Sequence, residues 1–398
     1  MHIDLLNPAS FVGGHPHDQY DWLRDHAPIY RHKDPSGSDF WAVTRFEDVH
    51  YIGRHSEYFS SSPTIMIADP DPEAPSSMGE YKMMLMMDPP EHTAYRKLIS
   101  REFTQGPANQ YGRRIKELAA QIVDAVIDKG ECDFIEEVAG EMPSFVIADL
   151  MGLPLVDGRE LYRLTEVIHS DPSALPPGAA VQAITKMFEY GAGVIKEKRA
   201  KPGDDLASKL LAAEVEGRKL ADEEFLLFFM LLIDAGGDTT RNLVGTGMYE
   251  LLQHPEVLDE LMADPEGQIA AAREELLRWT SPVIYMRRTV TAPVTMRGVD
   301  LAVGDKVVMY YGAANRDRDQ FKNPHQLNLA RQGQRHIAFG GGHHVCLGQW
   351  FARLEIDAIF LEVLRRLKDF QVLEPPQWMP SNFISGITRL PMGFAART

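Results

Sequence analysis

The stretch FGGGHHVCLG, residues 339–348, contains Cys346, one of only two cysteines in the 398-residue chain. Four glycines fall within the nine positions 340–348, and they let the backbone fold around the sulfur so that amide N–H groups can point at it. Residues 349–354 predict the start of a helix, whose N-terminal dipole favours an anion and lowers the pKa of a cysteine. This setting suits a thiolate that serves as a metal ligand.

The local sequence leaves two other interpretations of Cys346 open. A lone cysteine is usually a small buried hydrophobic residue without a chemical role. A Cys-His nucleophile is also compatible with His343 and His344 close by in sequence. A structural zinc site is a poor competitor, because there is no second CxxC-type pair and Cys132 lies far away in the chain.

Composition limits the class of protein. The chain is 44% hydrophobic and 25% charged, which is typical of a globular protein with a sizeable core. No linker or repeat divides it, so we expect a single large domain over residues 1–398, and a monomer. The chain has no leader-like start and no run of about 18 apolar residues, which predicts a cytoplasmic protein without a membrane anchor. Two cysteines fit a reducing compartment, and the net charge of −16 argues against nucleic acid as a partner.

Helical periodicity dominates the sequence. Clear helical segments are predicted at 115–126, 181–198, 223–254 and 259–279, whereas strand-like runs occur only at 40–44, 306–310 and 370–373. The fold class expected from this pattern is mainly α with a small β region.

The segment Asp88-Pro89-Pro90-Glu91-His92 predicts a helix start. Asp88 would be the N-cap, Pro89 the first helical residue and Glu91 the partner in a capping box. His92 and Arg96 lie four positions apart on this helix and share a face. They form either a solvated surface pair or two donors to one anionic group, such as a carboxylate or phosphate.

The helix predicted over 223–254 would span roughly 48 Å at about 1.5 Å per residue. Within it, Gly236 and Gly237 predict a local opening or kink, because each glycine in a helix interior costs about 1 kcal/mol relative to alanine. Asp238 and Thr239 follow directly, and a carboxylate beside a hydroxyl in an apolar helix could deliver protons. The alternative is close helix packing around a satisfied acid.

A third pair, Glu275 and Arg278, lies at i,i+3 on a helix and would ordinarily be a surface ion pair of little consequence. Polar residues farther along the chain, Asn315, Arg316, Asp317 and Arg331, could extend it into a structural network.

Together these motifs resemble the cytochrome P450 family of haem-thiolate monooxygenases, over nearly the whole chain and in the family's order. Residues 339–348 match the family pattern Phe-Gly-x-Gly-x-His-x-Cys-x-Gly at every fixed position. The resemblance implies the P450 fold, haem b (iron protoporphyrin IX) as cofactor and O2 as co-substrate. It also implies that the reaction inserts one oxygen atom into a C–H bond. A peroxide-driven peroxygenase and a non-catalytic haem sensor are the alternatives, and the intact Asp238-Thr239 pair favours the dioxygen route over both.

The resemblance assigns roles residue by residue. Cys346 becomes the axial iron ligand, whose thiolate favours O–O cleavage, and Asp238 and Thr239 become the acid and alcohol that manage protons. Glu275 and Arg278 become a structural pair that supports the core. The residues expected to bind the haem are His92, Arg96, Ala235, Gly236, Arg288, Phe339, Gly340, His344, Cys346 and Gly348. The resemblance also implies an arginine that binds a haem propionate after the helix of Glu275 and Arg278. We match it to Arg288, with Arg287 as the alternative because the register is ambiguous.

The family's substrate-recognition segments map onto a mostly apolar set of residues, which predicts a hydrophobic small molecule such as a terpenoid, a steroid, or an aromatic or alkyl compound. The expected pocket walls include Ile65, Leu231, Asp234, Val283, Ile284, Phe383 and Ile384. Asp234 occupies a position that is commonly apolar in the family. We expect it to pair with a basic side chain or to meet a polar substrate group, since an unpaired buried acid is costly.

Electrons are expected from a separate ferredoxin and its ferredoxin reductase. Residues 331–350 contain no Asp or Glu although the chain is acidic overall, and a basic patch near the thiolate would attract an acidic partner. The residues predicted to form that patch are Lys97, Arg101, Arg331, Arg335, His336, His343 and His344.

Overall fold

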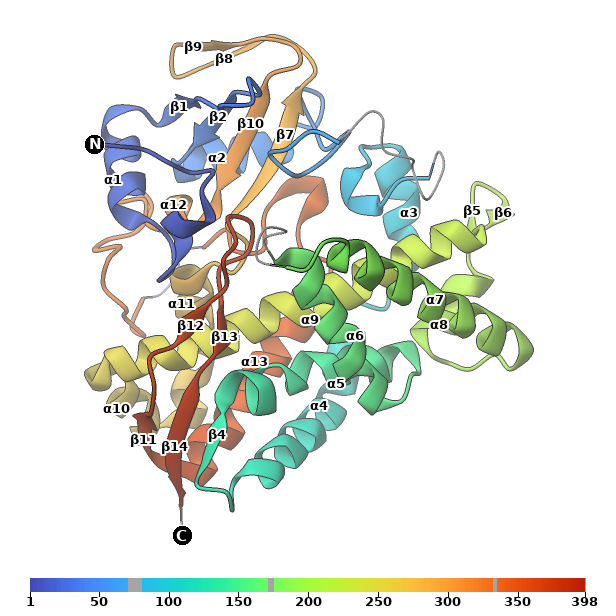
Figure 1. The fold of residues 1–398 in the computed structure, drawn as a ribbon, viewed down its shortest axis with the longest axis vertical. Helices are drawn as coiled ribbons and strands as arrows, with labels where there is room; N and C mark the ends of the chain where they lie inside the picture. Colours follow the sequence, from blue (N-terminus) through green and yellow to red (C-terminus); the bar gives the residue numbers. More distant parts are fainter. Residues whose placement is uncertain (71–80, 171–174, 332–334, 398) are drawn as a thin grey trace.

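The computed structural model describes residues 1–70, 81–170, 175–331 and 335–397. Helices account for 53% of the structure and strands for 14%, which confirms the mainly α prediction. In Figure 1 the strands β1, β2, β10 and β7 occupy the upper part of the molecule beside the N-terminus, and most helices fill the lower right. The long helix α9 (Asp222–Gln253) crosses the middle between these parts.

The other helices are α1 (His17–His26), α2 (Phe46–Arg54), α3 (Glu91–Ser100), α4 (Gln105–Val126), α5 (Glu141–Met151), α6 (Leu155–His169), α7 (Ala179–Ala200), α8 (Leu206–Ala212), α10 (Pro255–Ala263), α11 (Pro265–Thr280), α12 (Tyr311–Ala314) and α13 (Gln349–Arg366). The strands are β1 (Ile29–His32), β2 (Phe40–Val43), β3 (Phe59–Ser60), β4 (Glu131–Asp133), β5 (Glu214–Val215), β6 (Arg218–Lys219), β7 (Tyr285–Val290), β8 (Val294–Met296), β9 (Val299–Leu301), β10 (Lys306–Tyr310), β11 (Leu367–Val372), β12 (Gln377–Trp378), β13 (Ile387–Arg389) and β14 (Pro391–Ala396).

The largest sheet has the strand order β1-β2-β10-β7-β3. Only the β2–β10 pair is parallel, and the other neighbours in this sheet are antiparallel. All three predicted strands are present, the last as part of β11, which pairs with β14. Successive side chains of a strand point to opposite faces of the sheet. Arg287 and Arg288 of β7 therefore lie on different faces.

Helix α9 remains helical throughout, so the opening expected at its glycines does not occur. The glycines instead allow neighbouring segments to approach. A Cβ on Gly237 would lie 3.3 Å from the Tyr162 ring, and one on Gly245 would lie 2.2 Å from Ile135 Cδ1. The glycines therefore allow α9 to pack closely against α6 and the segment before α5.

Two predicted helix boundaries were wrong. The segment 259–279 is divided between α10 and α11, because Pro265 starts a new helix and Asp264 caps it by accepting a hydrogen bond from the Gly267 amide at 3.0 Å. Helix α3 begins at Glu91, and Asp88 is not its N-cap. The Asp88 carboxylate instead accepts hydrogen bonds from Ser60 Oγ and, at 2.8 Å, from the Ser61 amide.

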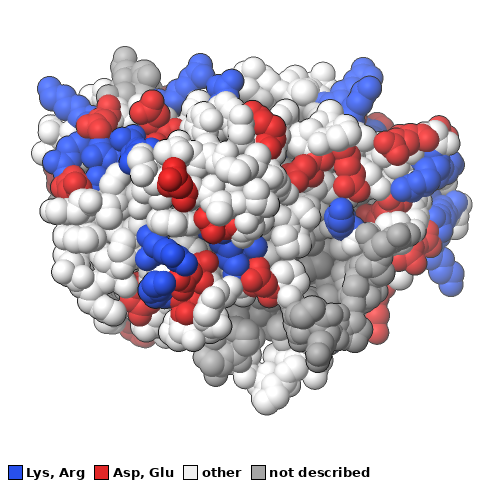
Figure 2. Space-filling model, turned by 90° about the horizontal axis from the view of Figure 1, so that it is seen from above, with Lys and Arg blue, Asp and Glu red and all other residues white. Residues whose placement is uncertain are grey.

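Two surface features follow from the side-chain distribution. On the face shown in Figure 2, basic and acidic groups are interspersed among uncharged residues. In the described residues no single helix is long and apolar enough to cross a membrane, although the bent pair Ile135–Met151 and Leu155–Ile168 passes the same length and composition test.

Candidate active site

The loop before α13 folds tightly around Cys346. The Cys346 amide donates to the Phe339 carbonyl at 2.9 Å, and the Gly348 amide donates to the sulfur. Gly342 has a φ of +66°, and a Cβ there would lie 1.8 Å from the Gly53 carbonyl oxygen in α2. Only glycine fits this position, and its absence of a side chain lets α2 support the loop directly.

The pKa of the Cys346 thiol lies above its usual value, which contradicts the expectation from the helix dipole. Burial raises it, and this outweighs the Gly348 amide and the charges of Arg96 and Arg353, all of which lower it. A bound metal would reverse the balance, because a coordinating thiol loses its proton outright.

Basic residues from three elements meet beside this loop. His92 and Arg96 come from α3, Arg288 from β7 and His344 from the loop itself. The rings of His92 and His344 lie 4.1 Å apart between centroids, and Arg96 Nη2 donates to the Val345 carbonyl at 2.6 Å. Arg96 and Val345 lie 249 positions apart in the sequence, and the fold brings their segments together.

Burial is the main cause of the low pKa values of both histidines. It lowers the pKa of His92 to about 4, with the Arg96 charge as the next cause. It lowers the pKa of His344 to about 2, with Arg288 next. Both rings are therefore neutral near pH 7 and add hydrogen-bonding groups, not charge, to the cluster.

The structure separates the two candidate propionate arginines. Arg287 donates to Asp69 Oδ1 at 2.6 Å and to the carbonyls of Met66 and Ile67. Arg288, on the opposite face of β7, donates to its neighbour's carbonyl at 2.8 Å and lies close enough to His344 to lower its pKa. Arg287 is committed to the loop around Asp69, and this supports Arg288 as the residue that faces the site.

Helix α9 borders the site on the other side. Ala235 is exposed although its neighbours Ile233 and Gly237 are buried, and Thr239 is half-buried with Oγ1 bonded to the Ala235 carbonyl at 3.2 Å. The exposure of Ala235 among buried neighbours shows that protein does not cover this face of α9, and we refer to the uncovered region as the internal space. Gly236 faces α5 instead of this space. A Cβ built on Gly236 would lie 3.5 Å from Ile147 Cδ1.

A haem group fits this arrangement. Within the described part of the chain, neither ring nitrogen of His92 has a hydrogen-bond partner, although the residue is only 2% exposed. Burying unsatisfied polar groups is costly, and an anionic group beside His92, Arg96 and Arg288 would satisfy them. No ion pair to an acid is formed by Arg96 or Arg288 within residues 1–70, 81–170, 175–331 and 335–397.

The other chemical interpretations of Cys346 receive no support. Among the residues described, no group of three or more His, Cys, Asp or Glu could hold a metal ion. His344 Nε2 lies 3.0 Å from Ser61 Oγ and 3.1 Å from the Met87 carbonyl. That ring is therefore engaged away from the sulfur, contrary to a Cys-His nucleophile.

The predicted apolar wall is also assembled from distant segments. The Ile284 amide donates to the Phe383 carbonyl at 2.8 Å. Val283 and Ile384 form an isolated antiparallel β-bridge. Ile65, Ile284, Phe383 and Ile384 pack in one apolar cluster. Leu231 comes from α9 and is buried, and Asp234 follows it on the same helix, half-buried next to exposed Ala235.

Sequence reasoning missed the surroundings of Asp238. Its carboxylate lies 3.7 Å from the Arg241 guanidinium, which in turn lies 2.7 Å from Glu166 on α6. The guanidinium also covers the Tyr162 ring at 5.0 Å. Arg241 is three positions after Asp238 on the same helix, and that spacing could have identified it.

The pair Glu275 and Arg278 forms a closed network, as the sequence suggested. Arg278 donates to Glu275 at 2.7 and 2.8 Å and to the carbonyls of Asn315 and Pro324. Arg331 donates to the same carboxylate at 3.0 Å. Glu275 is 3% exposed and Arg278 is 1% exposed, so these residues hold α11 to the loop that leads to Cys346.

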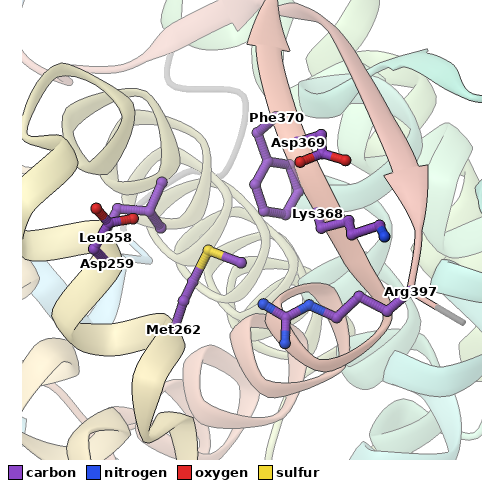
Figure 3. Close-up of a pocket in the computed structure, with 7 residues that line it drawn as sticks. All are labelled: Leu258, Asp259, Met262, Lys368, Asp369, Phe370 and Arg397. Carbon is purple, nitrogen blue, oxygen red and sulfur yellow. The ribbon is translucent and has the colours of Figure 1, made fainter.

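A separate groove of about 560 Å³ lies between α10 and β11. In Figure 3 its lining side chains, among them Met262 and Phe370, come from these two elements and from Arg397 near the end of the chain. It contains none of the predicted site residues, so it is not part of the candidate active site.

Comparisons with known proteins agree with this geometry. The family model described as Cytochrome P450 matches residues 178–393. The methyl-branched lipid omega-hydroxylase of Mycobacterium tuberculosis is 37% identical over 90% of this chain and 84% of its own length. The steroid C26-monooxygenase of Mycolicibacterium smegmatis is 34% identical over 98% of this chain and 96% of its own. Among solved structures, a Mycobacterium marinum cytochrome P450 in complex with pseudoionone superimposes with a TM-score of 0.92 at 35% identity, covering 99% of both chains.

Proposed function

Because the chain belongs to the cytochrome P450 family, with haem b as cofactor and O2 as co-substrate, we propose that it hydroxylates a lipid, either one with a methyl-branched chain or a steroid. The observation that supports the proposal is the face of α9 formed by exposed Ala235 and half-buried Thr239, which lies within an otherwise buried stretch of the helix. The apolar cluster of Ile65, Ile284, Phe383 and Ile384 supports a hydrophobic substrate. The names of the two curated relatives support the lipid class. Residues 1–398 would act as one domain.

The chain's own residues would bind the haem as follows. Cys346 would supply the thiolate ligand of the iron, with the Gly348 amide bonded to the sulfur. Arg96, Arg288 and the neutral rings of His92 and His344 surround the propionates, and Phe339 and Gly340 hold the loop closed. When bound, the haem supplies the chemistry that activates dioxygen and the C–H bond.

Asp238 and Thr239 would handle protons on the other side of the site. Thr239 Oγ1 lies on the face of α9 that borders the internal space, and its bond to the Ala235 carbonyl fixes its rotamer. Asp238 is 1% exposed and points away from that space toward Arg241. We propose that Asp238 passes protons to the hydroxyl of Thr239, as a positioned carboxylic acid can do.

The thiolate assignment has a direct test. The reduced protein with carbon monoxide should show the red-shifted Soret band of thiolate-ligated haem, and Cys346→Ser should lose that band together with lipid hydroxylation. The matched control is Cys132→Ser, since burial raises the pKa of Cys132 to about 12 and leaves it inert. A Soret band typical of histidine-ligated haem in the unmodified protein would contradict the proposal.

Electrons would come from a separate ferredoxin with its reductase. The predicted basic patch needs correction, because Arg331 is bound to Glu275, His336 to Glu274, and His344 lies in the buried cluster. The members that remain exposed are Lys97, Arg101, Arg335 and His343. Arg54 at the end of α2 and the indole of Trp350, 36% exposed at the start of α13, lie beside the same loop. An exposed aromatic ring among cations suits an acidic protein partner.

Docking at this surface predicts a dependence on charge and salt. Lys97→Glu and Arg335→Glu should each slow reduction by the ferredoxin, roughly tenfold at low ionic strength, and the difference should shrink as salt increases. Chemical reduction by dithionite should be unchanged. The control Lys219→Glu alters an exposed cation of β6, far along the chain from the Cys346 loop. Reduction that is insensitive to salt and to both substitutions would contradict docking here.

A further inference from the structure

The acid of α9 is linked to solvent through a row of charged groups. Glu166 on α6 is 31% exposed, Arg241 is 2% exposed, and the Asp238 side chain is 2% exposed. Arg241 lies between the two carboxylates, 2.7 Å from Glu166 and 3.7 Å from Asp238. The row therefore begins at the surface and ends next to Thr239, which borders the internal space.

Arg241 is held by several neighbours at once. Burial alone would lower its pKa, but Tyr162, Glu166, Asp238 and Asp133 together raise it. A guanidinium is not deprotonated in proteins, so it cannot pass a proton on. Its role is to keep two carboxylates close together that would otherwise repel each other.

Polar atoms around Arg241 lack protein partners. Within the described residues, Arg241 Nε and Nη1 form no hydrogen bond although both atoms are buried. Buried polar groups of this kind are normally satisfied by ordered water. Water at these atoms would connect Glu166 with Asp238 by hydrogen bonds.

The reaction of the family consumes protons that must come from solvent. Hydroxylation follows R–H + O2 + 2 e⁻ + 2 H⁺ → R–OH + H2O, so two protons enter for each turnover. Peroxide as the oxidant follows R–H + H2O2 → R–OH + H2O, which needs neither electrons nor added protons. A group that supplies protons therefore affects the first reaction and not the second.

We propose that Glu166 and Arg241 are positioning residues for proton delivery: Glu166 exchanges protons with bulk water at the surface of α6, and Arg241 holds it in line with Asp238. The proposal rests on the proposed role of Asp238 as the acid. In this arrangement Glu166 takes a proton from bulk water and releases it to the water that lies between Glu166 and Asp238. Asp238 then recovers the proton that it has given to Thr239.

Helix α6 provides a matched control. Arg159, near its start, forms an ion pair with Glu141 of α5, and Glu141 is 9% exposed while Arg159 is 43% exposed. Glu141→Gln therefore breaks an ion pair that fastens the same helix but does not touch Asp238. Glu166→Gln breaks the pair with Arg241 and retains the size of the side chain.

The test compares Asp238→Asn, Glu166→Gln, Arg241→Lys and Glu141→Gln in the haem-loaded protein. We expect Glu166→Gln to lower the dioxygen-driven rate about tenfold, the low end for loss of a proton-transfer group, and to raise the solvent deuterium isotope effect. Its peroxide-driven rate should change less than about twofold, as should both rates of Glu141→Gln. Thermal unfolding midpoints, followed by tryptophan fluorescence, should fall more in Glu166→Gln, which leaves the buried Arg241 without this partner, than in Glu141→Gln, which leaves the exposed Arg159.

The outcomes separate the two proposals. If Asp238→Asn leaves the isotope effect unchanged, the assigned role of Asp238 fails and the relay fails with it. If Asp238→Asn raises the isotope effect but Glu166→Gln behaves like Glu141→Gln, only the relay is overturned. A fall in the peroxide-driven rate of Glu166→Gln equal to the fall with dioxygen would show a structural role instead. Arg241→Lys retains the positive charge, so its dioxygen-driven rate should fall less than that of Glu166→Gln.

Discussion

The α11 network and the cluster beside the Cys346 loop are both built from buried polar residues, but they differ in how those residues are satisfied. Glu275, Arg278 and Arg331 bond to one another and to backbone carbonyls. His92 has two ring nitrogens without a partner in the described part of the chain, and Arg288 has only a neighbouring carbonyl. A closed network stabilises the fold, whereas an open one leaves groups for a ligand to bind.

The largest expected effect is on the closed network. Glu275→Gln should lower the free energy of unfolding by about 3–5 kcal/mol, because it leaves two arginines buried against a neutral amide. Denaturant unfolding followed by tryptophan fluorescence would measure the loss. The control Glu374→Gln breaks an ion pair with Arg389 in which both side chains are more than a third exposed, and it should leave the free energy of unfolding nearly unchanged. Equal losses in the two variants would remove the distinction between these pairs.

The open cluster should respond through ligand affinity and not through stability. Arg288→Gln removes a charged donor to a propionate and should weaken haem binding by about 1.5–3 kcal/mol, or more than about tenfold. Haem transfer to apomyoglobin would measure the dissociation rate. Arg287→Gln is the matched control, since it breaks the contact with Asp69 and should mainly loosen the loop that carries Ile65. Faster haem loss in Arg287→Gln than in Arg288→Gln would reverse the assignment.

The smallest expected effect concerns pH. His15 Nε2 closes the C-terminal end of α11 by bonding the carbonyls of Thr280 and Ser281 at 3.0 Å, and burial lowers its pKa from 6.5 to about 4. The folded state therefore holds the neutral ring. Its contribution is complete above pH 6.5, falls as the unfolded chain takes up a proton, and levels off below about pH 4.

This pH effect can be separated from that of other histidines. Between pH 6.5 and 4, His15 should account for about 2.5 kcal/mol of lost stability. His15→Gln keeps an N–H donor but does not titrate, so its unfolding free energy should fall less steeply over that interval. Parallel curves for the two proteins would mean that His15 does not contribute.

The sequence predicted most of the fold because its signals are local. The helix of 32 residues has the predicted length, displaced by a single position, and the strand 306–310 has the predicted bounds. The errors were also local in origin. Asp88 has the chemistry of an N-cap, but the tertiary contact with Ser60 and Ser61 competes for the same carboxylate.

The site could be predicted where one motif carries the chemistry. Cys346 and its glycines identify themselves by composition and spacing, and helical spacing pairs His92 with Arg96. Glu166 could not be found in this way, because it lies far from Asp238 in sequence and joins it only through Arg241. The basic patch was overestimated for the same reason, since sequence does not show that Arg331 pairs with the buried Glu275 and that His336 pairs with Glu274.

By itself, the sequence indicated the family and the residues that we propose as thiolate ligand, acid and alcohol, because each of these depends on residues close together in the chain. Only the tertiary structure decided between Arg287 and Arg288, showed where the glycines of α9 point, and linked Asp238 to the surface. These features depend on which side chains of distant segments share a face or compete for one partner. Packing sets that outcome, because it decides whether a buried charge finds a partner within the protein or is left for a ligand.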